Sequence, residues 1–274
     1  MKNVMKLILC ALVLSATFSC TKESQDRSGR TVPRSATEDS IRAILKSKTW
    51  KYYEYFTNYD SSATNLVWKM CRDTNSQNLS LNRVTYLTDS TYTETDDHGN
   101  VYNGTWSLLS GGTQIRVVNS LGTFTSAIQK LVSGEFQWYE ASTKHYGFMV
   151  PDSVTCDTST SGRLTLLTAH IWKYDEYFSN YNTVTPRMVY KRGKSNSPVN
   201  LNLNQAQFYT NGTYWEIDAN GNYVSGTWTF LNGNTQLRVN NYLGTFTSNI
   251  RRLDTKRLEW QDVAGSTYGE EVPY

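Results

Sequence analysis

Apolar and polar residues alternate along most of the chain after residue 49. Trp50, Tyr52, Glu54 and Phe56 fall on one side of an extended segment, and the residues between them fall on the other. A period of two is typical of an antiparallel strand with one buried face. The same alternation predicts further strands at residues 66–72, 79–87, 90–95, 102–109, 114–119, 123–131 and 135–140. Turns rich in Gly, Asn and Asp separate them.

This pattern occurs twice, with a constant offset of 122 residues, so that Trp50 recurs as Trp172 and Pro151 as Pro273. Such a repeat is much longer than the roughly 20–50 residues of a solenoid unit, and each copy is therefore expected to close its own core. Consecutive short strands with one apolar face close most economically into a barrel, which removes exposed strand edges. We predict an all-β chain with two tandem small up-and-down antiparallel β-barrels, at residues 38–151 and 163–274.

A short helix is expected before each barrel. Residues 35–38 resemble a capping box, and Ile41, Ile44 and Leu45 then share one helical face. Leu164, Leu167 and Thr168 occupy the corresponding place in the second copy. Residues 152–162 are rich in Ser and Thr and are expected to form the linker.

Short motifs in both copies resemble the lipocalin-like domain of bacterial envelope lipoproteins. They are Trp50, Ser90-Thr91-Tyr92, Asp97-His98-Gly99-Asn100 and Gly104-Thr105-Trp106, and then Trp172, Gly212-Thr213-Tyr214, Asp218 with Gly221-Asn222, and Gly226-Thr227-Trp228. The resemblance implies a small cup-shaped barrel, or calyx, usually without enzymatic activity. The Gly that usually stands two residues before the opening Trp is Lys48 or His170 here, so no particular lipophile can be carried over.

The N-terminal segment predicts export. Lys2 and Lys6 precede an apolar run, residues 7–14, that is too short to span a bilayer but fits a secretion signal at residues 1–19. Residues 16–20 resemble a lipobox, with Thr17 where Leu is usual, so Cys20 is the expected lipidation site. Residues 20–37 would form a polar tether to the outer membrane of a bacterial envelope, in its periplasmic or surface leaflet. Ordinary cleavage, which leaves a soluble secreted protein, is the alternative.

Charge and cysteines narrow the function further. The chain has 27 Lys and Arg, and loss of Lys2 and Lys6 leaves 25 against 24 Asp and Glu, with no clustered basic face. Nucleic acid is therefore not an expected partner, and a monomer is expected. Cys71 and Cys156 remain after processing and could pair in an oxidising compartment. No metal, cofactor or catalytic motif is found in the sequence.

The residues predicted to face inward form the candidate ligand site. They are Trp50, Tyr52, Glu54, Phe56, Tyr92, Glu94, Trp106 and Trp138, and in the second copy Trp172, Tyr174, Glu176, Phe178, Tyr214, Glu216, Trp228 and Trp260. Aromatic rings offer apolar faces, whereas an unpaired carboxylate inside a barrel costs several kcal/mol and must meet water, a base or a ligand. The alternative without a functional role places Glu54 and Glu176 at the rim or the solvent face of the barrel, or pairs them with Arg116 and Arg238.

Three functions fit these residues. The first is non-catalytic binding of a small apolar or amphipathic ligand in the calyx, which requires a cavity of about 300 Å³ or more. The second is adhesion or scaffolding, in which exposed Tyr rows and loops bind glycan or protein; its Tyr residues are Tyr53, Tyr55, Tyr59, Tyr177 and Tyr181. The third is a glycosidase that uses Glu54 with Glu94.

Overall fold

The computed structural model describes residues 38–72, 74–156 and 160–274. The all-β prediction is confirmed: these residues contain 18 strands, two short α-helices and one 3-10 turn. None of the described helices is long and apolar enough to cross a membrane. The predicted signal segment, Cys20 and the tether lie outside the described residues.

The first copy contains nine strands and the second copy contains nine. In chain order they are β1 (Thr49–Thr57), β2 (Asn65–Lys69), β3 (Arg83–Tyr86), β4 (Thr91–Thr95), β5 (Val101–Leu109), β6 (Gln114–Asn119), β7 (Gly122–Val132), β8 (Glu135–Glu140) and β9 (His145–Pro151), and then β10 (Ile171–Ser179), β11 (Arg187–Lys191), β12 (Gln205–Phe208), β13 (Thr213–Ile217), β14 (Tyr223–Leu231), β15 (Gln236–Asn241), β16 (Gly244–Leu253), β17 (Leu258–Asp262) and β18 (Thr267–Pro273).

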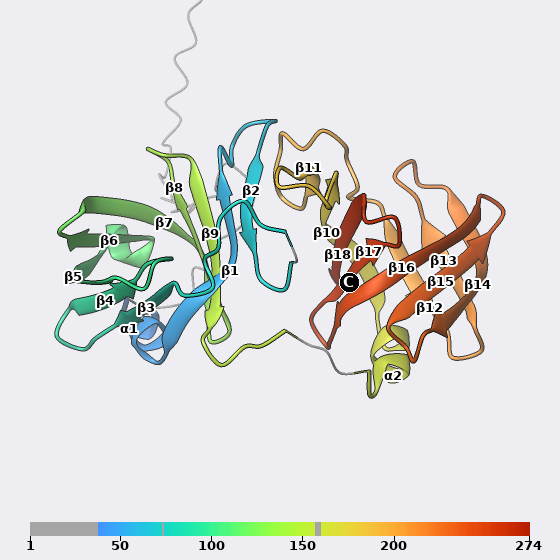
Figure 1. The fold of residues 1–274 in the computed structure, drawn as a ribbon, viewed down its shortest axis with the longest axis horizontal. Helices are drawn as coiled ribbons and strands as arrows, with labels where there is room; N and C mark the ends of the chain where they lie inside the picture. Colours follow the sequence, from blue (N-terminus) through green and yellow to red (C-terminus); the bar gives the residue numbers. More distant parts are fainter. Residues whose placement is uncertain (1–37, 73, 157–159) are drawn as a thin grey trace, which may run out of the picture.

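The strands pair antiparallel and close on themselves (Figure 1). In the first copy β3 to β9 pair in chain order, and β1 pairs with both β3 and β9. In the second copy β12 to β18 pair in the same way, and β10 pairs with β12 and β18. A single pairing, Arg187 of β11 with Asn65 of β2, joins the two copies into one sheet.

Strand β9 closes the first copy against β1, and the alternation did not predict it. Its residues Tyr146 to Val150 are all buried, so no polar face marks it as a strand. Met149 packs inside the first copy, whereas Tyr146, Phe148 and Val150 pack on the outside against the second copy. A strand with two buried faces has a continuous apolar sequence, which does not alternate.

A helix precedes β1 and another precedes β10, as predicted. In α1 (Glu38–Lys46), Leu45 is fully buried and Ile41 and Ile44 pack on the same core. The indole of Trp50 donates a hydrogen bond to the carbonyl of Leu45 over 3.0 Å, which fixes the helix across one end of the sheet. Trp172 and Leu167 of α2 (Arg163–Thr168) make the same bond over 2.9 Å.

The face predicted for α2 is partly wrong. Leu167 is buried as expected, but Leu164 is 46% exposed and Leu166 packs against the core instead. The offset of 122 residues places Leu166, not Leu164, at the position of Ile44. The buried face of α2 therefore matches that of α1 at this position of the repeat.

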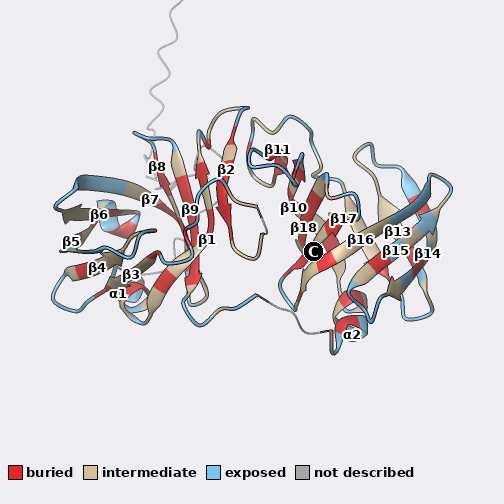
Figure 2. Ribbon diagram, in the orientation of Figure 1, coloured by how far each residue is buried: buried red, intermediate tan, exposed pale blue. Residues whose placement is uncertain are grey.

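The two copies pack through the outer faces of β1, β2 and β9 and of β10, β11 and β18. Figure 2 shows buried residues along these strands. Phe56 and Phe178, equivalent residues, stack with ring centroids 6.3 Å apart and planes 12° apart. Tyr59 stacks on Tyr146 at 4.2 Å, and Tyr181 stacks on Tyr268 at 4.3 Å. The packing is thus nearly symmetric between the copies.

Cys71 and Cys156 form a disulfide, with Cα atoms 5.6 Å apart. It confirms the pairing that the sequence allowed. The bond ties the segment after β9 to the loop after β2, and so holds the start of the linker against the first copy.

Candidate ligand-binding site

A cavity of about 360 Å³ lies inside the closed strands of the first copy. The α1 end of this copy is filled by Leu45, Trp50, Trp106 and Leu108. The cavity lies toward the opposite end, where the β6–β7 turn brings Leu121 and Phe124 to its edge with 63% and 36% exposure. Alternate turns of an up-and-down barrel lie at the same end, so the β4–β5 and β8–β9 turns flank this opening as well.

Most of the cavity wall is aromatic or aliphatic. Its lining residues are Tyr52, Tyr55, Val84, Tyr86, Tyr92, Glu94, Ile115, Val117, Asn119, Leu121, Phe124, Ser126, Phe136, Trp138, Glu140, Thr143, His145 and Met149. This composition, apolar walls with a few polar groups, is that of a small-molecule site.

Tyr52, Tyr55 and Trp138 form an aromatic triad in this wall. Their ring centroids lie 5.3 Å apart for Tyr52 and Tyr55, and 6.3 Å and 6.2 Å from each to Trp138. Gly147 lets the indole lie against the strand, because a Cβ there would come within 2.4 Å of the ring. The rings are therefore placed by β1, β8 and β9 together.

The polar groups of the cavity lie beside this triad. Tyr55 and His145 share a hydrogen bond of 2.8 Å between the hydroxyl and Nδ1. Thr143 donates to the Glu140 carboxylate over 2.7 Å. Glu94 has no hydrogen-bond or ion-pair partner among the residues that the structure describes. Burial, and then the nearby Asp96, raise the pKa of the Glu94 carboxyl above its usual range.

The negative charges of the cavity also reach the tyrosines. Burial, followed by Glu140 and Glu94, raises the pKa of Tyr55 to about 12. Burial and neighbouring groups that include Glu94 raise the pKa of Tyr52 well above its usual range. Both hydroxyls therefore stay protonated at neutral pH and can donate hydrogen bonds.

Of the eight candidate residues in the first copy, the structure brings four to the cavity: Tyr52, Tyr92, Glu94 and Trp138. Trp50 and Trp106 belong to the filled floor below it. Glu54 and Phe56 do not face the calyx, so that part of the prediction is wrong. In the second copy Trp172, Tyr214 and Trp228 lie in the core, and Glu176 and Phe178 face the first copy.

The physical reason is a bulge in β1. Tyr52 pairs with Met149 and Glu54 pairs with Phe148, so Tyr53 is an extra residue that turns the following side chains over. Tyr55 then points inward, and Glu54 and Phe56 point outward. Strand β10 has the same irregularity between Tyr174 and Glu176. Alternation alone missed Tyr55 because a strict period of two carries the wrong phase beyond the bulge.

The second copy repeats the triad. Tyr174, Tyr177 and Trp260 have centroids 5.7 Å, 6.2 Å and 6.2 Å apart. Glu271 takes the place of Met149 and accepts a hydrogen bond from Trp260 over 2.8 Å. Burial, together with the charge of Glu216, raises the pKa of Glu271 to about 7. The inner face of the second copy is thus more acidic than that of the first.

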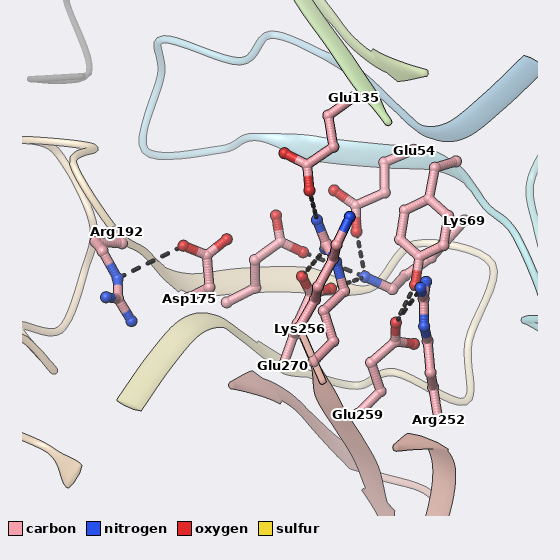
Figure 3. Close-up of polar contacts among 12 residues, drawn as sticks. Glu54, Lys69, Glu135, Asp175, Arg192, Arg252, Lys256, Glu259 and Glu270 are labelled. Atoms are coloured by element: carbon pink, nitrogen blue, oxygen red, sulfur yellow. Dashed lines mark hydrogen bonds and ion pairs between the residues drawn. The ribbon is translucent and has the colours of Figure 1, made fainter. Parts of the chain in front are cut away.

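Glu54 and Glu176 belong to a buried charge network between the copies. Figure 3 shows Glu54, Lys69 and Glu270 of this network. Lys69 contacts Glu54, and its Nζ lies 2.8 Å from Glu270 and 3.4 Å from Glu176. Lys191, the equivalent of Lys69, contacts Glu176. The alternative interpretation of the sequence paired these acids with Arg116 and Arg238, but their partners are Lys69 and Lys191.

The second copy adds charges that the first copy lacks. Glu270 and Arg257 contact each other, and they stand where the first copy has Phe148 and Glu135. Burial raises the pKa of Glu270, but Arg257 and Lys69 outweigh it and hold the value well below its usual range. Burial lowers the pKa of Lys69, but Glu270 and Glu54 outweigh it in turn. The charges of Glu270 and Lys69 are therefore stabilised by their partners.

This network is not an open metal site. Carboxylate oxygens of Glu54, Glu176 and Glu270 lie within 4.8 Å of one another. The ammonium groups of Lys69 and Lys191 already contact all three carboxylates. The lysines thus supply the positive charge that an ion would bring.

Comparison with known proteins gives a limited likeness. No protein-family model matches the chain, and no curated protein matches it. A DUF4847 family protein from Bacteroides vulgatus ATCC 8482 is 13% identical with a TM-score of 0.29, over 40% of this chain and 96% of that chain. A lipocalin-like protein from Bacteroides uniformis ATCC 8492 is 10% identical with a TM-score of 0.28, over 39% and 98%.

Proposed function

We propose that the protein is a non-catalytic binding protein made of two lipocalin-like barrels in tandem, which holds a small, partly apolar ligand in the calyx of the first copy. Residues 1–19 would direct export, and acyl chains on Cys20 would anchor the protein to the outer membrane of the envelope. The observation that carries the proposal is the cavity of about 360 Å³ inside the first copy.

The cavity supports ligand binding in three ways. Its volume lies within the range of about 300–1,000 Å³ that is usual for small-molecule sites. Its rings supply apolar contact area, and its few polar groups can fix the orientation of a ligand. The floor of packed Trp and Leu residues is held by the Trp50 hydrogen bond to α1, so the cavity has a rigid base.

The two other functions have weaker support. The adhesion hypothesis used Tyr53, Tyr59 and Tyr181 as exposed residues, but these rings are buried between the copies. Tyr55 lines the cavity instead of the outer surface. The glycosidase hypothesis needs Glu54 beside Glu94, whereas Glu54 lies in the network between the copies and Glu94 in the cavity.

A blocking variant tests the proposal. Ser126 lines the cavity, and its neighbour Thr125 on β7 is exposed on the opposite face. The neutral fluorescent probe N-phenyl-1-naphthylamine should bind the wild type and the Thr125→Trp control equally. Ser126→Trp should weaken binding at least tenfold, since the indole fills the space. Equal binding by all three proteins would place the site elsewhere and overturn the proposal.

The anchor is tested separately by mass spectrometry of the protein from a membrane fraction. A diacylated or triacylated Cys20 at the mature N-terminus is expected, and Cys20→Ser should release the protein into the soluble fraction. An unmodified N-terminus elsewhere would show ordinary cleavage instead.

A further inference from the structure

The first cavity is acidic. Glu94 and Glu140 both line it, and among its lining residues there is no Lys or Arg. His145 is the one basic side chain in the wall, and its Nδ1 is engaged with the Tyr55 hydroxyl. The cavity therefore has no positive side chain that balances its two carboxylates when His145 is neutral.

The carboxylates have few partners inside the protein. Glu140 accepts a hydrogen bond from Thr143, and Glu94 has no partner among the described residues. Partial burial of a carboxylate without a partner costs free energy, because the charge loses contacts with water that the protein does not replace. By contrast, the carboxylates between the two copies are each matched by Lys or Arg. The carboxylates between the copies are thus neutralised, whereas Glu94 and Glu140 have no Lys or Arg among the residues that line the cavity with them.

The triad of Tyr52, Tyr55 and Trp138 lies in the same wall as these carboxylates. The face of an aromatic ring carries partial negative charge and attracts a cation within about 6 Å of its centroid. Rings and carboxylates at one site favour an ammonium group with apolar substituents. The rings contact the apolar substituents and attract the cation, and the carboxylates balance its charge.

We propose that the calyx of the first copy selects a cationic amphiphile, a substituted ammonium whose charged head lies among Tyr52, Tyr55 and Trp138 and near Glu94 and Glu140. This inference rests on the proposed function and specifies its ligand class. The apolar part of the ligand would contact the aliphatic wall formed by Val84, Ile115 and Val117.

The second copy retains these features although other wall residues differ. Glu216 and Asp262 stand at the positions of Glu94 and Glu140, and the triad recurs as Tyr174, Tyr177 and Trp260. Over the same wall, Val84 becomes Ala206, Phe136 becomes Leu258 and His145 becomes Thr267. Both copies thus keep the acids and the rings, although the size and shape of other wall residues differ. This is expected if the cavity selects its ligand by charge.

Three probes of similar shape and different charge test the inference. Isothermal titration calorimetry would compare phenyltrimethylammonium, its neutral isostere tert-butylbenzene, and the anion benzenesulfonate. The cation should bind at least tenfold more tightly than either of the others. Glu94→Gln should lower the affinity for the cation about fivefold and leave the affinity for the neutral probe unchanged. Asp39→Asn, which removes an exposed acid from α1, is the matched control and should change neither.

The outcomes separate this inference from the proposed function. Equal affinity for the cation and the neutral isostere, or tighter binding of the anion, would overturn charge selection while ligand binding in the calyx still stood. Binding of none of the three probes, together with failure of the naphthylamine probe, would overturn both. A cation preference that persists unchanged in the Glu94→Gln, Glu140→Gln double variant would also refute the inference.

Discussion

Lys69 of the first copy and Glu270 of the second form an ion pair, with Nζ and Oε2 2.8 Å apart and side chains 1% and 0% exposed. Two charges can remain at such burial only if each meets a partner, because desolvation costs several kcal/mol for each ion. The pair therefore depends on both copies being docked. Neither copy can keep these charges buried alone, so we expect the two to fold and unfold as an interdependent unit.

Replacing Lys69 by Met should lower the free energy of unfolding by about 3–5 kcal/mol, since Glu54, Glu176 and Glu270 lose a shared cation. Urea denaturation followed by tryptophan fluorescence measures the change. Lys144→Met is the matched control: its pair with Asp60 spans 3.8 Å and its side chain is 53% exposed, so the cost should stay below about 1 kcal/mol. Similar small losses for both variants would contradict a tightly coupled interface.

Acid should destabilise the protein through Glu270. The pKa of its carboxyl is lower in the folded protein than the ordinary value of 4.5, so its stabilising contribution is complete above that pH. The contribution is lost as the pH falls below 4.5, because the unfolded chain then takes up a proton first. Stability curves between pH 3 and pH 6 should therefore be steeper for the wild type than for Glu270→Gln. Parallel curves would refute this role.

The adjacent residue should show the opposite pH dependence. Glu271 points to the inner face of the second copy, and its pKa is raised to about 7. The folded state then holds a proton that the unfolded state releases above its ordinary pKa of 4.5, so stability falls as the pH rises from about 4.5 to 7.

Glu271→Met, which installs the residue of the first copy, should remove this dependence. The variant should gain about 3 kcal/mol over the wild type at pH 8, since the pKa rises from 4.5 to about 7 and each pKa unit corresponds to about 1.4 kcal/mol. The gain should nearly vanish at pH 4. Urea titrations at the two pH values measure it, and a gain independent of pH would point to packing instead of ionisation.

The Cys71–Cys156 disulfide should stabilise the folded chain. It closes a loop with a sequence separation of 85, and loss of such a crosslink typically costs about 2–5 kcal/mol. The Cys71→Ser, Cys156→Ser double variant should unfold at lower urea concentration than the oxidised wild type and match the reduced wild type. Identical midpoints for oxidised and reduced protein would show that the bond contributes nothing.

Much of the fold could be predicted from the sequence because alternation and repeat length are local signals. The helix before β1, the strands from β2 to β8 and the disulfide partners follow from spacing and residue type. Strand β9 could not be predicted in this way, since contact with the second copy buries its outer face and removes the polar positions. The apolar residues of β9 are explained by its contact with the second copy, which is seen only in the folded structure.

The lining of the cavity was predicted in part. Tyr52, Tyr92, Glu94 and Trp138 were placed correctly, whereas Glu54 and Phe56 were not, because the bulge at Tyr53 reverses the phase of β1. Tyr55 was missed because it follows the bulge. Glu140 was overlooked although it lies two residues after Trp138 on β8 and so shares its face. Comparison of the two copies could have found Glu140, since Asp262 keeps its acidity.

The most direct test of the calyx as the ligand site is crystallography of the protein with 4-bromophenyltrimethylammonium, whose bromine gives an anomalous signal. We predict a peak inside the first copy, with the ammonium among Tyr52, Tyr55 and Trp138. A peak only on the outer surface, or none in the cavity under conditions where calorimetry shows saturation, would contradict the account.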